Sequence, residues 1–203
     1  MGEGGLRFHI AGFPVAVPLG GILGVLLIAY LWTPNFSQPG RSGIVLAVVF
    51  AVLLYAGVLV HELAHAWAAR AFGYPVHGIT LWLLGGYTVY ERRTSRPWPE
   101  LVIAVIGPVS ALLLAGLCWV LAEATTGSSS LLLGALAWTN GLLGILNLLP
   151  GAPLDGGGVV KSLVWRASGS ESTGAKAAGY AGLVIAVLLG VLAVWSFSRG
   201  GSG

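Results

Sequence analysis

Charged residues are scarce in this chain of 203 residues: they make up 8% of the sequence, against 56% hydrophobic residues. Soluble domains carry about 25% charged residues. The deficit therefore excludes an ordinary soluble protein and predicts an integral membrane protein in contact with the lipid bilayer. The formal net charge of +3 is too small an excess to indicate a nucleic-acid partner.

Cysteine is nearly absent as well, because Cys118 is the single example and it lies in an apolar run. One cysteine excludes a disulfide within the chain and a zinc site built on several thiolates. We expect Cys118 to fill space between helices.

Five apolar segments are long enough to cross a bilayer, which takes about 20 residues in a helix. We expect these spans at residues 13–32, 43–71, 98–122, 131–149 and 177–197. Gly107-Pro108 lies inside the third span and predicts a kink or a local break there.

Residues 76–93, between the second and third spans, are too short to cross the membrane. They are rich in Thr, Tyr, Val and Trp and contain Gly85-Gly86, which predicts two short strands with a glycine turn. An exposed strand edge there could pair with an extended peptide; a plain amphipathic hairpin at the interface is an equal alternative. We therefore expect an all-α polytopic membrane protein with a short membrane-associated hairpin, residues 1–203 forming a single domain.

The second span carries the sequence His61-Glu62-Leu63-Ala64-His65 near its end. Residues four apart lie on one face of a helix, so His61 and His65 can bind a single metal ion. Glu62 lies beside them and can act as general base on a water at that metal. A charged group costs roughly 2.5–3.5 kcal/mol at the centre of a membrane helix, so a chance occurrence is a poor explanation.

A catalytic zinc ion takes three protein ligands, so two histidines leave one ligand to be found. Among the remaining acids, Asp155 is the one at a glycine-framed helix end on the same side of the membrane. We expect it to complete a site of two nitrogens and one oxygen for one Zn²⁺ ion. Asn147 precedes it, and we expect this amide to donate a hydrogen bond to substrate or oxyanion; capping of backbone carbonyls is nearly as good an explanation.

Basic residues lie mainly on one side of the predicted membrane. The segment 68–98 carries Arg70, Arg92, Arg93 and Arg96, and the segment 156–176 carries Lys161, Arg166 and Lys176. By the positive-inside rule these segments and the N-terminus face the cytoplasm. We expect a multi-pass cell-membrane protein with its metal site toward the cytoplasm.

The chain resembles the site-2 protease family of intramembrane zinc metalloproteases, of the prokaryotic type. The resemblance covers nearly the whole chain. It rests on the motif at 61–65, on Leu84-Gly85-Gly86, on Ile106-Gly107-Pro108, and on the segment running from Asn147 through Pro150 to Asp155-Gly156-Gly157. It implies His61, His65 and Asp155 as zinc ligands and Glu62 as the catalytic acid and base.

The resemblance also implies cleavage of substrates within or near their transmembrane segments. We expect Gly85 and Gly86 to contact the substrate. Many relatives continue into a sixth span and nucleotide-binding regulatory domains, which this chain does not show. The competing hypothesis is a metal-binding membrane transporter or an inactive scaffold, although such a protein has no need for Glu62 beside the ligands. The sequence does not indicate the oligomeric state.

Overall fold

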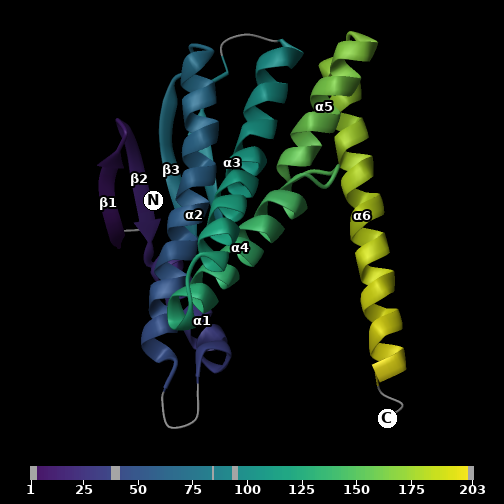
Figure 1. Ribbon diagram of the computed structural model, residues 1–203. Coiled ribbons are helices and arrows are strands. Elements are labelled where there is room, and N and C mark those ends of the chain that lie inside the picture. Colours follow the sequence, from purple (N-terminus) through teal and green to yellow (C-terminus); the bar gives the residue numbers. More distant parts are fainter. Residues whose placement is uncertain (1–3, 38–41, 84, 93–95, 201–203) are drawn as a thin grey trace. The chain divides into compact units, whose positions relative to one another are not determined.

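The computed structural model describes residues 4–37, 42–83, 85–92 and 96–200 (Figure 1). Its elements, in chain order, are β1 (Gly5–Ile10), β2 (Phe13–Pro18), α1 (Leu19–Phe36), α2 (Ile44–Ala71), β3 (Val76–Trp82), β4 (Gly85–Tyr90), α3 (Pro97–Glu123), α4 (Gly127–Asn147), α5 (Asp155–Ser168) and α6 (Glu171–Gly200). Five of the described helices, α1, α2, α3, α4 and α6, are long and apolar enough to cross a membrane. The expectation of a multi-pass helical membrane protein with five spans is confirmed.

The chain forms two compact units. The first comprises residues 1–95 and 106–145, and the second comprises residues 96–105 and 146–203. Helix α3 contributes to both units. The histidine motif lies in the first unit, and Asp155 lies in the second.

The first unit contains a four-stranded sheet in the order β1-β2-β3-β4. Strands β1 and β2 are antiparallel, β2 and β3 pair in parallel through Val15 and Ile79, and β3 and β4 are antiparallel. The turn between β1 and β2 consists of Ala11 and Gly12, with φ of 53° and 77°. Two positive φ angles match the right-handed twist of a tight hairpin.

Helix α2 organises the core of this unit, because its buried residues recur every three or four positions. The stripe runs through Ala47, Phe50, Ala51, Tyr55, Gly57, Val58, His61, Glu62, His65, Ala66 and Ala69. Its middle packs with Phe13, Val15, Ile79 and Leu81 of the sheet. The three polar residues of the motif therefore continue an apolar helix face that the fold already buries.

The second unit is organised by the packing of α5 on α6. The Lys161 ammonium lies 2.9 Å from a Glu171 carboxylate oxygen. Gly169, with a φ of 72°, ends α5 in the left-handed conformation that favours glycine. The loop before α5 is fixed to α6, because the Ala152 amide donates to the Ala178 carbonyl at 3.2 Å.

The structure differs from the sequence-based expectations at several boundaries. The first span begins at Leu19, because residues 13–18 form strand β2, and residues 5–10 form an unexpected strand. Helix α3 is continuous through Pro108, so no break occurs there. The strands expected in residues 76–93 are present as β3 and β4; Leu84 and Arg93 of that segment lie outside the described residues.

Candidate active site

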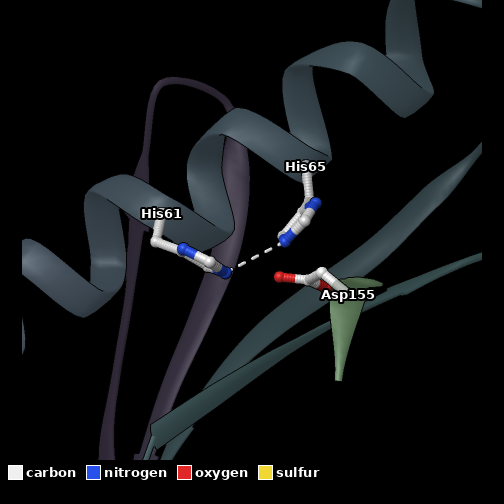
Figure 2. A group of neighbouring side chains, drawn as sticks. All are labelled: His61, His65 and Asp155. Carbon is white, nitrogen blue, oxygen red and sulfur yellow. Dashed lines mark hydrogen bonds between the residues drawn. The ribbon is translucent and has the colours of Figure 1, made fainter. Parts of the chain in front are cut away.

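His61 and His65 lie one turn apart on the buried face of α2 (Figure 2). The two residues are 3% and 7% exposed, and their Nε2 atoms lie 3.1 Å apart. Two nitrogens bound to one tetrahedral zinc ion at the usual Zn–N distance are about 3.3 Å apart. The helix therefore presents two ligand atoms at nearly the spacing that one zinc ion requires, so these residues fit the metal.

Gly107 of α3 forms the wall against which the two rings lie. A Cβ atom built at this position would overlap the His65 Nε2 and Cε1 atoms and would lie 2.9 Å from the His61 Nε2. Glycine here leaves the space that the two donor atoms face. The predicted role of Gly107 was a helix kink, and the structure shows that its missing side chain makes room for the histidine pair.

Glu62 is buried beside the histidines, with 5% of the residue exposed. The Thr88 hydroxyl of β4 donates to the Glu62 Oε2 at 2.7 Å, and the Glu62 carbonyl oxygen lies 3.0 Å from the same hydroxyl. A Cβ atom at Gly86 would lie 2.8 Å from the Glu62 Cγ. Strand β4 therefore covers the glutamate and fixes its carboxylate.

Asp155 is the first residue of α5 and is partly exposed. The preceding loop folds tightly onto its helix turn, since a Cβ at Gly156 would overlap the Leu149 carbonyl oxygen and one at Gly157 would overlap the Ala152 amide nitrogen. The tight packing of this loop thus fixes the backbone position of Asp155, from which the carboxylate side chain extends. The first turn of a helix also favours a negative charge.

The remaining predicted site residues, Asn147, Gly85 and Gly86, differ in how closely they are packed. Asn147 is the last residue of α4 and is partly buried in the second unit. Gly85 and Gly86 begin β4, which is an edge strand of the sheet. Gly86 packs on Glu62 and Leu81, whereas nothing lies within 4 Å of a Cβ built at Gly85.

Three polar residues near the motif were missed by the sequence analysis: Tyr55, Thr88 and Asn140. The Tyr55 hydroxyl lies 3.0 Å and 2.8 Å from the carbonyl oxygens of Trp82 and Leu83 and so holds the β3–β4 turn on α2. Asn140 of α4 is 1% exposed, and its side-chain oxygen lies against Gly57, one turn before His61. A polar side chain inside a predicted span was a usable signal for Asn140 and Tyr55. No such signal exists for Thr88, because its partner depends on which strand face meets α2.

The fold and the histidine pair define a multi-pass membrane protein with a metallopeptidase motif. The family model described as Peptidase family M50 matches residues 49–129 and 122–189 of the chain. The chain belongs to this peptidase family, and the resemblance identified in the sequence is confirmed.

Curated relatives support the same assignment. Rip3 of Mycobacterium tuberculosis is 38% identical over 208 residues, covering 92% of this chain and 53% of the relative. The protein sll0528 of Synechocystis sp. is 36% identical over 189 residues, covering 87% of this chain and 50% of the relative. Both are provisionally named zinc metalloproteases. The chain thus spans about half the length of the curated relatives it matches.

A solved structure shows the same fold. The site-2 protease from Methanocaldococcus jannaschii superimposes with a TM-score of 0.69, over 95% of this chain and 86% of that chain, at 24% sequence identity. The match agrees with the helical membrane fold expected from the sequence.

Proposed function

We propose that this chain is the catalytic core of an intramembrane zinc metalloprotease. It hydrolyses peptide bonds within or near the transmembrane segments of membrane-bound substrates. The observation that carries this proposal is a buried glutamate, Glu62, held beside two histidine nitrogens 3.1 Å apart on a helix apolar enough to cross the membrane. Membership of Peptidase family M50 and the names of the relatives support it.

The proposed zinc ligands are His61, His65 and Asp155, the three residues labelled in Figure 2. Two imidazoles and a carboxylate are a donor set that suits Zn²⁺ and leaves a position open for catalysis. A zinc ion held there supplies Lewis-acid chemistry: it lowers the pKa of a water molecule and polarises the scissile carbonyl.

Glu62 is the proposed general base and acid. Its carboxylate takes a proton from the attacking water and delivers it to the amine nitrogen that leaves when the peptide bond breaks. Burial excludes bulk water from this carboxylate, and the Thr88 hydroxyl orients it. A transporter or a scaffold has no use for a glutamate fixed in this way, so the peptidase proposal is favoured.

Substrate is proposed to enter as an extended segment along the edge of β4. Edge strands present unpaired backbone groups that a peptide can join, and β4 ends the sheet beside the glutamate. In this arrangement Gly85 and Gly86 allow close approach of the substrate backbone. Asn147 is proposed to donate a hydrogen bond to the substrate carbonyl or to the oxyanion.

The active site is proposed to face the cytoplasm of a prokaryotic cell. The support is that Arg70 lies nine residues beyond His61 on α2, with further basic residues after α4. Labelling by a membrane-impermeant thiol reagent tests this: a cysteine placed at Arg166 should react in inside-out vesicles. Reaction in intact cells instead would contradict the orientation.

The decisive experiment is cleavage of a single-span substrate in liposomes, with zinc content measured on the same samples. We expect Glu62→Gln to keep its zinc and to lose cleavage by about 10²- to 10⁴-fold, the usual contribution of a general base. Asp155→Ala should lose both zinc and cleavage. The matched control is Glu123→Gln, at an exposed glutamate that ends α3.

Retained cleavage in Glu62→Gln would contradict the proposed reaction. Retained zinc in Asp155→Ala would instead show that another group is the third ligand. Because a passing ion in a transporter also binds to histidines, zinc content alone does not distinguish the classes; cleavage that a chelator abolishes does.

A further inference from the structure

One face of β4 lies directly on the catalytic end of α2. Along the strand, Gly86, Thr88 and Tyr90 are partly buried, whereas Tyr87 and Val89 between them are exposed. Alternation of this kind places the first three residues on one face of the sheet. Gly86 and Thr88 both contact Glu62, so the strand approaches the glutamate with two successive inward-facing positions.

The contact between Thr88 and Glu62 is directed at the side chain. The hydroxyl lies 2.7 Å from the carboxylate oxygen and 3.0 Å from the main-chain carbonyl oxygen of the same residue. That carbonyl lies in the interior of α2, where helix hydrogen bonding already satisfies it. A bond to a carboxylate is also shorter and stronger than one to a neutral acceptor. The carboxylate is therefore the main partner of the hydroxyl.

The strand makes this contact rigid. Threonine is branched at Cβ and has a restricted χ1 angle, and its backbone is paired with Ile79 in the sheet. The turn of the same hairpin is held on α2 by the Tyr55 hydroxyl. The flexible Glu62 side chain is thus held by β4, and the β3–β4 hairpin is itself attached to α2 at Tyr55.

We propose that Thr88 is the positioning residue for Glu62, holding the carboxylate in the orientation that proton transfer requires. Gly86 leaves the space in which that orientation fits. This inference rests on the proposed function, because it assigns Thr88 to the reaction of Glu62. Strand β4 thus positions the general base, in addition to its other proposed role of binding substrate.

The test is a set of threonine substitutions in the full chain. Thr88→Val keeps the shape and removes the hydroxyl, Thr88→Ser keeps the hydroxyl, and Thr80→Val makes the same exchange on β3, away from Glu62. We expect Thr88→Val to lower kcat roughly 10- to 100-fold, since a misplacement of about 1 Å can cost that much. KM and zinc content should stay within about twofold, Thr88→Ser should recover most of kcat, and Thr80→Val should match the wild type.

A second measurement does not depend on activity. Isotope-edited infrared difference spectra between the wild type and Glu62→Gln isolate the carboxyl band of Glu62. We expect this band to shift in Thr88→Val, to return in Thr88→Ser and to stay in place in Thr80→Val. The comparison can be made on protein without metal, so it reports the hydrogen bond itself.

The outcomes separate this inference from the proposed function. If Glu62→Gln abolishes cleavage while Thr88→Val keeps full kcat and an unshifted band, the positioning role is wrong and the peptidase proposal stands. If Thr88→Ser is as impaired as Thr88→Val, or if zinc is lost in step with kcat, Thr88 is structural only. If Glu62→Gln cleaves normally, the proposed function fails first.

Discussion

The two hairpins of the sheet have similar lengths and different relations to the active site. The β1–β2 hairpin pairs in an unbroken register, its outer strand is mostly exposed, and its turn is held by the Arg70 guanidinium at 2.9 Å from the Gly12 carbonyl oxygen. The β3–β4 hairpin has a register shift near Gly78 and touches α2 through Tyr55 and through Glu62. The turn of the first hairpin is attached at Arg70, near the C-terminal end of α2, whereas the second hairpin lies on Glu62.

This difference shows how a strand with no proposed catalytic side chain of its own becomes part of the proposed active site. Strand β4 contributes an absent side chain at Gly86 and one hydroxyl at Thr88, and both act on Glu62. Strand β2 instead supports β3 through its buried residues Phe13 and Val15. Substitutions in the β3–β4 hairpin should therefore lower activity more than those in the β1–β2 hairpin, which should mainly lower stability.

Among substitutions that compare the two hairpins, the largest effect is expected for Gly86→Ala. The added Cβ would lie 2.8 Å from the Glu62 Cγ and 3.1 Å from a Leu81 methyl group, so the glutamate must move. Cleavage should fall about 100-fold, mainly in kcat. Steady-state kinetics in liposomes measure this, and Gly4→Ala, where nothing lies within 4 Å of the new atom, is the control beside β1. A change confined to KM would assign Gly86 to substrate contact instead.

An intermediate effect is expected for Tyr55→Phe. This exchange removes the hydroxyl that holds the β3–β4 turn and leaves the bond between Thr88 and Glu62 in place. The free energy of unfolding should fall by about 1 kcal/mol, the usual scale of a hydrogen bond inside a membrane protein, and kcat should fall less than in Gly86→Ala. Thermal unfolding in detergent checks this against Tyr30→Phe, at a tyrosine that is 77% exposed. Equal stability of the two variants would contradict a role of Tyr55 in holding the turn.

The smallest effect on activity is expected for Arg70→Lys. The Arg70 guanidinium lies 3.6 Å from the centre of the Phe13 ring and also donates to the turn of the β1–β2 hairpin, a combination that lysine cannot reproduce. Stability should fall slightly, because Arg70 is exposed, and kcat should stay within about twofold. Arg7→Lys on β1 is the matched control. A loss of kcat as large as that of Thr88→Val would contradict the inference that the β3–β4 hairpin affects activity more than the β1–β2 hairpin.

The sequence was sufficient to predict five spans, the second hairpin and the helix that carries the histidine motif, because each depends on local composition or on helical spacing. The second span, expected at residues 43–71, corresponds to α2 within one residue at its start. The roles of His61, His65 and Asp155 as ligands and of Glu62 as general base stay predictions. So do the substrate contacts of Asn147, Gly85 and Gly86.

The first hairpin could not be predicted with the same means. Its turn places Ala11 at a φ of 53°, a conformation usually taken by Asn, Asp or Gly, so the expected turn signal is missing. Its second strand is also continuous with an apolar helix, which made residues 13–32 look like one span. The contact between Thr88 and Glu62 joins residues 26 positions apart, and only the packing of the sheet on α2 decides it.

The histidine pair depends on Gly107, although Gly107 is not itself a metal ligand. The space beside the two rings exists because one position on a neighbouring helix has nothing to place in it. In a systematic mutational survey of this chain, Gly107 will therefore behave like a metal ligand, although it has no donor atom. A substitution at Gly107 is limited by volume, whereas one at His61 or His65 is limited by the need for a nitrogen donor.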